Sequence, residues 1–431
     1  MAKITNIKEL REFIVYLEDK YDLLNFKIDG VKPWQLIRLS LYYDLGIAAN
    51  IMSKPHSSMT KKNKILNILN IIKSSIFKNP FLSKKTDIVI FPHARIKKAG
   101  DKQIDIYTHY FIEKMLKDKI DFIEIEHSHL GKHLKQKQKW RYHKDFILVI
   151  RDLFYKMIKL KNIDYNILAQ LENEVKQKIG SNFNLTSKLI IASKKYKIEY
   201  SLYKRLLEQI EPKQIYLVVS YGGLGSLIKA AKDLNIEVLE FQHGTFSKYH
   251  FGYYYGEDKK DLEYFPNKFL VWNEYWKNLM NFPIEDTNII IKPFAYLENK
   301  KNSYSQVKRI KNHAIVLSQG ILGDKIASEI LNNWEYFKQF DLKYKLHPGE
   351  YEIWKTYPSL VKLLEFNNVE LIKDIDLYKL FSGCEYQIGV FSTALFEGVE
   401  FGCKTVLLNL PGIEYMNKFI KLNDNIKIIH D

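Results

Sequence analysis

The spacing of apolar residues predicts that the first part of the chain, residues 1 to about 85, is helical. Ile7, Leu10, Ile14 and Leu17 recur at helical intervals. Between residues 61 and 78, apolar side chains fall on one helical face and lysines flank them. Such a basic amphipathic helix either lies on an anionic membrane surface or packs on the protein's own core. The sequence leaves both possibilities open.

Short apolar runs after residue 85 have the character of buried parallel strands. Residues 86–92 form the first of them, and runs at 215–219 and 236–239 enclose a helical pattern. This order of strand, helix and strand predicts a Rossmann-like domain over residues 86–265. Residues 135–210 are rich in lysine and helical in period, more than one crossover requires, so we expect a helical insertion there.

A second alternation of strands and helices covers residues 266–431. Two successive alternations predict an α/β fold of two doubly wound domains that face each other across a cleft. The expected strands are 314–317, 343–346, 369–372, 386–390 and 405–408, and the expected helices are 324–337, 377–381 and 394–401.

The length, composition and charge of the chain limit the kinds of protein it can be. The chain has 431 residues, 46% hydrophobic and 27% charged, which is typical of a folded protein of about two domains. Its net charge of +16 either attracts nucleic acid, an anionic membrane or an acidic polysaccharide, or reflects a lysine-rich coding bias alone. The sequence has no zinc-finger spacing, no RNA-binding aromatic signature and no clear helix-turn-helix, so we expect no nucleic acid partner.

The sequence shows no pattern typical of metal ligands. Cys384 and Cys403 are the only cysteines, and no cysteines and histidines have metal-ligand spacing. Asp374 and Asp376 directly precede an expected helix, so we interpret their carboxylates as helix caps. We therefore expect no metal and no cofactor beyond a substrate.

The start of the chain and its apolar runs predict a cytoplasmic protein. The residues after Met1 lack the apolar core of a secretory signal, and nowhere do about 18 apolar residues follow one another. The basic helix would allow the protein to lie at the inner face of the cytoplasmic membrane.

The segment Glu240–Lys248 places a histidine directly after an apolar strand. Ligands of open α/β sheets bind beyond the carboxyl ends of the strands, where His243 is expected. Because the pKa of histidine lies near neutrality, His243 could take the proton of an acceptor hydroxyl. Lys248 could pair with an acidic donor or acceptor. The alternative for His243 is a purely structural hydrogen bond.

Three polar segments of the second domain follow strands in the same way. His347 precedes Pro348 and could neutralise the phosphate of a leaving nucleotide. Ser392 and Thr393 begin an expected helix whose free N–H groups could bind that phosphate, although such residues often only cap helices. One turn further, Glu397 could bind ribose hydroxyls. Donor phosphates or sugar could also contact Ser318, Gln319 and Gly320.

The first domain holds weaker candidates. Gly222 and Gly223 form a tight strand-to-helix turn that could approach substrate, and Arg95 follows the first buried strand. Asp101 and Asp105, in the same region, are further candidates for a general base, because a carboxylate in a dry cleft can accept a proton.

The order of these motifs resembles a known family. The motifs are HGTxxK at His243–Lys248, HP at His347–Pro348, and Ser392-Thr393 with Glu397. Together they are similar, over about residues 215–412, to bacterial surface-polysaccharide transferases of the GT-B type. These include capsule polysaccharide transferases with a QHG motif and the CDP-glycerol glycerophosphotransferases. Bacterial sialyltransferases with an HP motif are also similar, but they carry an acidic motif where this chain has Tyr221-Gly222-Gly223.

The resemblance implies a GT-B fold and a metal-independent, inverting glycosyltransferase. Such an enzyme would move a sugar from a CMP-, UDP- or similar nucleotide to a bacterial surface polysaccharide or lipid-linked glycan. It implies that His243 is the base and that His347 and Ser392-Thr393 hold the donor phosphate. The alternatives are a CDP-polyol phosphotransferase, a nucleotide-sugar epimerase and a basic glycan- or lipid-binding protein without catalysis.

Overall fold

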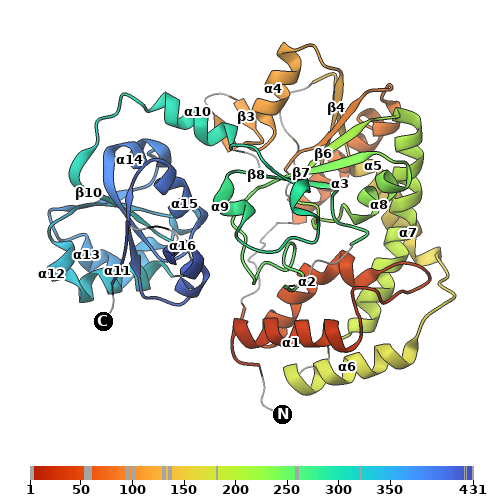
Figure 1. Cartoon of the computed structure of the whole chain (residues 1–431), viewed down its shortest axis with the longest axis horizontal. Helices are drawn as coiled ribbons and strands as arrows, with labels where there is room; N and C mark the ends of the chain where they lie inside the picture. Colours follow the sequence, from red (N-terminus) through yellow and green to blue (C-terminus); the bar gives the residue numbers. More distant parts are fainter. Residues whose placement is uncertain are drawn as a thin grey trace. The chain divides into compact units, whose positions relative to one another are not determined.

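The chain folds into two compact units, residues 1–293 and 294–431. The computed structural model describes residues 4–52, 61–93, 97–99, 102–128, 133, 138–180, 183–257, 262–320, 322–421, 423 and 425–429. Each unit is built on its own parallel β-sheet with helices packed against it (Figure 1). The expectation of two Rossmann-like α/β domains, with additional helices at the N-terminus, is confirmed.

A seven-stranded parallel sheet forms the centre of the first unit, in the order β5-β4-β1-β6-β7-β8-β9. A separate antiparallel hairpin joins β2 to β3. The strands are β1 Ile88–Phe91, β2 Lys97–Ala99, β3 Lys102–Ile104, β4 Phe122–Glu126, β5 Arg141–His143, β6 Gln214–Val218, β7 Glu237–Phe241, β8 Lys268–Val271 and β9 Ile289–Ile291.

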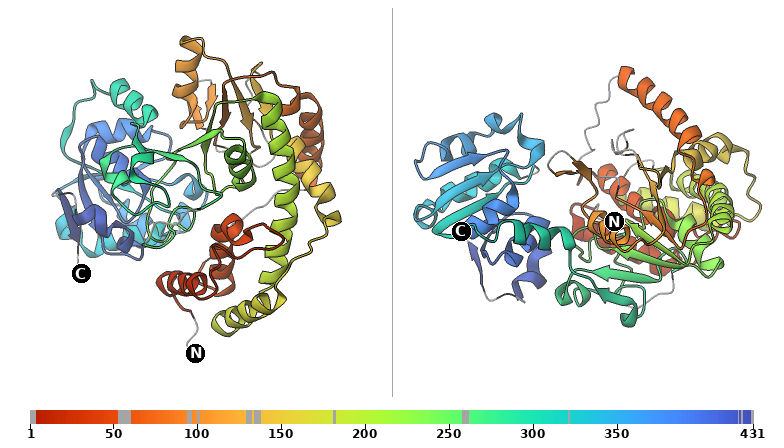
Figure 2. Two further views of the ribbon diagram at one scale, coloured as in Figure 1. Left: turned by 45° about the vertical axis from the view of Figure 1, so that its right-hand side comes forward. Right: turned by 90° about the horizontal axis from the view of Figure 1, so that it is seen from above.

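The longest described helix, the 26-residue α7, belongs to this unit (Figure 2) and contributes to its core. Tyr203, Leu206 and Ile210 of α7 are fully buried with apolar residues of the sheet and of α8. Glu211 ends the helix in the left-handed conformation, at a φ of 54°. The helices are α1 Ile7–Lys20, α2 Pro33–Ala48, α3 Lys61–Phe77, α4 His109–Lys117, α5 Asp145–Phe154, α6 Tyr165–Ile179, α7 Leu185–Ile210, α8 Gly225–Asp233 and α9 Glu274–Lys277, with 3-10 turns at Pro80–Leu82, Tyr155–Met157 and Asp286–Asn288.

The N-terminal helices are joined to the rest of the first unit through a buried arginine. The Arg38 side chain is 1% exposed and pairs with Glu18, Nε to Oε1 at 2.5 Å. Its Nη1 donates hydrogen bonds to the carbonyl oxygens of Phe251 (2.8 Å) and Tyr254. The guanidinium also lies 4.4 Å from the centre of the Phe251 ring. These contacts fix the loop that follows β7, whose residues 249–255 include five aromatic side chains and which we call the aromatic loop.

The boundary between the units differs from the expected one at 265/266. The strands β8 and β9 continue the first sheet, so the first unit extends to Pro293. The expected insertion at 135–210 contributes β5 to the edge of the sheet, and its helix α7 packs in the core. Two of the three β9 side chains are exposed, which hid that strand from an argument based on apolar runs.

Helix α3 occupies the segment that was expected to be a basic amphipathic helix. Its side chains are described from Leu69 onward. Ser74 and Ser75 are buried, whereas Leu69, Ile72 and Ile76 are 58%, 49% and 59% exposed. These three apolar residues therefore do not pack on the protein's own core. Across the described ranges, no helix is both long enough and apolar enough to cross a membrane.

The second unit has a six-stranded parallel sheet in the order β12-β11-β10-β13-β14-β15. The five expected strands are confirmed. An unexpected strand, β15, extends the sheet at its edge. The strands are β10 Ile310–Leu317, β11 Asp341–Lys345, β12 Val369–Ile372, β13 Cys384–Gly389, β14 Lys404–Leu408 and β15 Ile426–Ile429. The helices are α10 Ala295–Ser303, α11 Gly323–Asn332, α12 Trp334–Phe337, α13 Pro358–Leu363, α14 Leu377–Gly383, α15 Thr393–Glu400 and α16 Asn417–Lys421, with 3-10 turns at Pro348–Glu350, Trp354–Thr356 and Ile413–Met416.

Candidate active site

His243 lies just beyond the carboxyl end of β7, where two tyrosines bind its ring. Tyr221 Oη lies 2.9 Å from His243 Nε2, and Tyr253 Oη lies 3.1 Å from Nδ1. Tyr253 also donates its proton to Glu240 Oε1, at 2.6 Å. The Tyr253 oxygen is then the acceptor for Nδ1–H, which leaves the lone pair on His243 Nε2. This is the tautomer that a general base requires.

The hydrogen bonds continue in the same direction beyond Tyr221. The Gly252 N–H donates to His250 Nδ1 at 3.3 Å, so the proton of His250 is on Nε2. That nitrogen lies 3.4 Å from Tyr221 Oη. Burial lowers the pKa of His250 to about 4, so its ring is neutral near pH 7. A single directed chain of hydrogen bonds therefore runs from His250 through His243 to Glu240.

Glu240 is a fully buried carboxyl group at the end of this chain. It lies on β7 and is 0% exposed. Its Oε1 accepts a hydrogen bond from the Ser220 N–H at 3.0 Å as well as the Tyr253 hydroxyl. Burial raises the pKa of Glu240 to about 7, although these hydrogen bonds lower it. Glu240 is thus poised to change its charge near neutral pH.

Two further aromatic rings, from the region after β1, lie beside the His243 ring. The rings of His93 and His243 are nearly parallel, with centres 5.8 Å apart, and the Tyr107 ring meets His243 edge-on at 6.2 Å. Asp105 holds both neighbours in place, because its carboxylate accepts bonds from the N–H groups of His93 and Tyr107, each at 3.0 Å. Thr108 Oγ1 donates a third bond at 2.7 Å. Burial raises the pKa of Asp105 to about 6.

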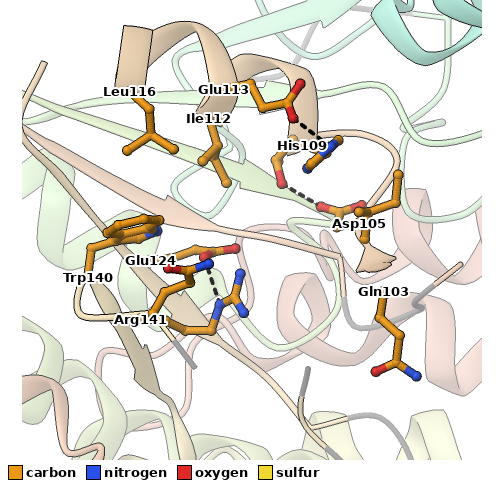
Figure 3. A pocket seen from close by; sticks show the side chains of 12 residues that line it. Gln103, Asp105, His109, Ile112, Glu113, Leu116, Glu124, Trp140 and Arg141 are labelled. Atoms are coloured by element: carbon orange, nitrogen blue, oxygen red, sulfur yellow. Dashed lines mark hydrogen bonds and ion pairs between the residues drawn. The ribbon is translucent and has the colours of Figure 1, made fainter. Parts of the chain in front are cut away.

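The structure therefore gives Asp105 a positioning role beside the candidate base. Asp105 also lines a cavity of about 190 Å³ together with His109, Glu113, Glu124 and Arg141 (Figure 3). Arg141 Nε and Glu124 Oε2, from the neighbouring strands β5 and β4, pair on the wall of this cavity at 2.8 Å. Polar side chains of both charges thus line a space next to the site.

The glycine turn after β6 lies beside a second cavity of about 210 Å³, lined by His93, Lys144, Val219 and Gly222 among others. Gly223 has a φ of +84°, and its carbonyl accepts a hydrogen bond from the buried Lys144 Nζ at 3.0 Å. Val219 has a φ of +67°, which is a strained conformation for a β-branched residue. The strained turn directs Tyr221 toward His243.

The candidate Lys248 is not joined to this cluster by the described contacts. Lys248 is exposed and its ammonium lies 5.6 Å from the centre of the Tyr249 ring. Its carbonyl accepts a hydrogen bond from Arg11 Nε at 3.2 Å. Arg95 and Asp101 lie outside the described residues.

In the second unit, the loops after β10 and β11 meet at a buried glutamate. Glu350 is 0% exposed and accepts hydrogen bonds from Ser318 Oγ at 2.9 Å and from the His347 N–H at 2.8 Å. The His347 ring accepts a bond from the Gly349 N–H through Nδ1, at 3.1 Å. A Cβ placed on Gly320 would lie 3.8 Å from the same nitrogen. Ser318, Gly320 and His347 are therefore neighbours.

The loop after β13 joins the same group. Phe391 N–H donates to Gln319 Oε1 at 3.1 Å, and Gln319 Nε2 donates to the Phe391 carbonyl. Ser392 follows and caps α15, its Oγ accepting from the Ala394 N–H at 3.2 Å. Thr393 is the first residue of α15. The predicted donor residues of three separate segments thus lie along one end of the sheet.

Glu397 and Asp376 have contacts elsewhere in this unit. Glu397 contributes to the raised pKa of the buried Tyr378 on α14, after the larger effect of burial. Asp376 caps α14 as predicted, accepting from the Tyr378 N–H at 2.9 Å, and its other oxygen accepts from Lys300 Nζ at 2.7 Å.

Sequence reasoning missed the residues that orient the histidines. Tyr221 and Tyr253 lie 22 and 10 residues from His243 in the sequence, at spacings that predict no contact, and the fold brings the three together. Glu240 and Glu350 did leave a signal. Glu240 lies between the apolar residues Leu239 and Phe241, two positions before the QHG sequence, and a glutamate in such a place indicates a carboxyl group that is buried for a reason. Glu350 stands where a helix-capping glutamate is expected after His347.

Comparison with known proteins gives remote structural similarities. No protein-family model matches the chain, and no curated protein matches it. A UDP-GlcNAc 2-epimerase from Methanocaldococcus jannaschii is 11% identical, with a TM-score of 0.46 over 79% of this chain and 88% of that one. A putative UDP-N-acetylglucosamine 2-epimerase from Listeria monocytogenes is 10% identical, with a TM-score of 0.45 over 80% and 84%.

A glycosyltransferase from Rickettsia africae is 12% identical, with a TM-score of 0.38 over 81% of this chain and 84% of that one. All three similarities lie below a TM-score of 0.5, so the activities named for these proteins are not transferred to this chain. The assignment of function rests on the residues of the two sheet ends described above.

Proposed function

We propose that this protein is a glycosyltransferase that moves a sugar from a nucleotide-activated donor to a bacterial surface polysaccharide or lipid-linked glycan. The hydrogen-bonded state of His243 carries this proposal. Its Nε2 is an acceptor, its Nδ1–H is held by Tyr253, and Glu240 lies behind Tyr253. A base oriented by a second group and backed by a carboxyl group has the arrangement needed to activate a hydroxyl nucleophile.

In the proposed reaction, the acceptor hydroxyl replaces the Tyr221 hydroxyl at His243 Nε2. Its oxygen bonds to the anomeric carbon while its proton passes to Nε2. The bond between that carbon and the phosphate oxygen breaks, and the nucleotide leaves from the opposite face, which inverts the anomeric configuration. No step of this transfer requires a metal.

The second unit would bind the donor. Negative charge grows on the leaving phosphate in the transition state, and hydrogen-bond donors fixed in advance stabilise it. His347 and the free N–H groups at the start of the eight-residue α15 are suitable donors. Glu350 fixes the backbone of His347 and the hydroxyl of Ser318. Glu397 is the proposed ligand of the donor ribose.

A nucleotide screen followed by turnover assays tests the proposal. Thermal unfolding in the presence of CMP, CDP, UDP or GDP identifies the nucleotide that stabilises the chain. With the matching donor and an acceptor glycan, His243→Ala should lower kcat at least about 100-fold, the scale of general base catalysis, while nucleotide stabilisation is retained. His313→Ala is the control, because His313 lies within β10, four residues before its carboxyl end, and pairs with Asp341 at 3.3 Å.

The same assay separates the alternatives. Conversion of the nucleotide sugar without any acceptor would identify an epimerase, and transfer of a polyol phosphate would identify the phosphotransferase. Tyr253→Phe should lower kcat because it breaks the link to Glu240, whereas Tyr221→Phe should preserve turnover because it leaves Nε2 open. Full turnover in His243→Ala would refute the assigned base.

Attachment to the membrane is a separate part of the proposal. The exposed Leu69, Ile72 and Ile76 of α3, together with the net charge of +16, would favour an anionic surface such as the inner face of the cytoplasmic membrane. Sedimentation with anionic vesicles tests this. Equal binding by the wild type and by a variant with Ser at all three positions would contradict it.

A further inference from the structure

Two histidines and two carboxylates form a compact cluster at the edge of the first sheet, apart from His243. Ligand atoms of Glu126, His133 and His143 all lie within 4.8 Å of one another. Glu126 ends β4, His143 ends β5, and His133 comes from the connection between these strands. The Glu126 and Asp145 side chains are 3% and 1% exposed. A cluster of this composition is buried only if its charges are compensated.

Neighbouring groups fix which nitrogen of each histidine faces the cluster. Asp145 Oδ2 lies 2.7 Å from His133 Nε2 and accepts its proton, so the Nδ1 of His133 is directed to Glu126 Oε1, at 3.5 Å. Ser74 donates its hydroxyl proton to Asp145 and lies 2.6 Å from His143 Nδ1. The Ser74 oxygen then accepts from Nδ1–H, which leaves Nε2 of His143 as the nitrogen with a lone pair.

We propose that Glu126, His133 and His143 bind a divalent transition metal of the zinc class, with His133 Nδ1, His143 Nε2 and a Glu126 oxygen as ligands. Two imidazoles and one carboxylate are a common zinc ligand set that keeps a fourth position for water. A carboxylate behind a ligating histidine, here Asp145 behind His133, is the usual way in which proteins orient such a ligand.

The other oxygen of Glu126 has a different neighbour. Arg141 Nε lies 3.6 Å from Glu126 Oε2 and 2.8 Å from Glu124 Oε2. Glu126 Oε1, which faces His133, is therefore the metal ligand. With a divalent ion, the charges of Glu126 and Asp145 would be balanced.

Metal binding requires the two imidazole rings to turn out of their stacked arrangement. The rings of His133 and His143 lie parallel at an angle of 7°, with centres 3.6 Å apart. In this stack the lone pairs of His133 Nδ1 and His143 Nε2 lie in parallel planes. Each ring must therefore turn before both nitrogens can point at one ion. The ligand atoms, which lie within 4.8 Å of one another, must also approach to the spacing of about 3.4 Å that bonds of about 2.1 Å impose in a tetrahedral site. The ion would fasten the connection between β4 and β5 to the sheet.

Zinc titration of the purified full chain tests the proposal. After treatment with a chelator, the chain is titrated with ZnCl₂ at pH 7.5 in competition with a chromophoric chelator. We expect one tight site per chain, and loss of that site in His133→Ala and in His143→Ala. Asp145→Asn should weaken binding about 10- to 100-fold, the effect of removing a group that orients a ligand.

Two controls keep the result specific. His313→Ala removes a histidine of the second unit that pairs with Asp341 and should leave zinc binding unchanged. His243→Ala tests whether the tyrosine-bound histidine is the true ligand. The proposal is overturned if the wild type binds no zinc tightly, or if the tight site survives loss of His133 and His143 together in a variant whose circular dichroism matches the wild type. In either case a proton between His133 and Glu126 would take the place of the metal.

Discussion

The buried carboxyl group behind Tyr253 predicts a specific dependence of stability on pH. Burial raises the pKa of Glu240 from an ordinary 4.5 to about 7. Between these values the folded protein holds a proton that the unfolded chain has released. The contribution of this group is therefore fully present below about pH 4.5 and is lost as the pH rises through about 7. At about 1.4 kcal/mol per pKa unit, the difference in the free energy of unfolding is about 3 kcal/mol.

Glu240→Gln isolates this contribution. The glutamine oxygen can accept the same bonds from the Ser220 N–H and the Tyr253 hydroxyl, but it does not ionise. We expect the free energy of unfolding of the wild type to fall, relative to Glu240→Gln, by about 2.5 kcal/mol between pH 5 and pH 8, because part of the total is already lost at pH 5. The control is Glu237→Gln on the same strand, whose carboxyl has a lowered pKa beside Lys268 after the opposing effect of burial. Glu237 stays ionised over this range, so its variant should run parallel to the wild type.

Urea unfolding at a series of pH values measures the effect. Trp334 and Trp354 are the tryptophans of the second unit, so a background with phenylalanine at both positions confines tryptophan fluorescence to the first unit. Parallel stability curves for the wild type and Glu240→Gln between pH 5 and pH 8 would refute the reasoning. They would mean that Glu240 holds its ordinary pKa despite its burial.

Three further substitutions test other parts of the structure. Arg38→Ala should lower the free energy of unfolding of the first unit by about 3–5 kcal/mol in urea, because Glu18 is left buried without its partner. A decrease below about 1 kcal/mol would contradict the assignment of a buried ion pair. Val219→Gly should be more stable than Val219→Ala by about 1 kcal/mol in the same assay, because glycine removes the cost of a positive φ; the reverse order would contradict the strain. Glu350→Ala should lower the midpoint of the second unit's transition by the equivalent of about 1–3 kcal/mol, since the buried Ser318 hydroxyl and the His347 N–H lose their acceptor. It should also abolish stabilisation by nucleotide, and a variant that binds nucleotide normally would contradict the proposed donor site.

Strands that consist mostly of apolar residues could be predicted from the sequence. The central strands β1, β6, β7 and β14 and the second half of β10 were predicted because most of their residues are apolar and buried. The more exposed strands β11 and β12 were predicted because they alternate with helices in the same domain. Short edge strands such as β9 lack that signal, and the boundary at 265/266 was misplaced as a result. His243 could be located from its place after β7, since topology alone puts such loops at one end of a sheet.

The partners of the site residues could not be predicted in the same way. The tautomer of His243 depends on Tyr221 and Tyr253, which meet it only after the aromatic loop has folded back. The cluster of Glu126, His133 and His143 comes from two strands and their connection, so its spacing in the sequence matches no metal motif. Sequence patterns indicate where a chain is buried, but hydrogen-bond partners depend on packing between segments.

The burial of Arg38 against the Phe251 and Tyr254 carbonyls matters for anyone who shortens or recombines this chain. A fragment that begins at β1 would retain every strand of the first sheet and could look well folded by circular dichroism. It would nevertheless lose the anchor of the loop that carries His250 and Tyr253. Exchange of the N-terminal helices between related proteins should therefore transfer this arginine together with its glutamate, or the histidine will lose its orientation.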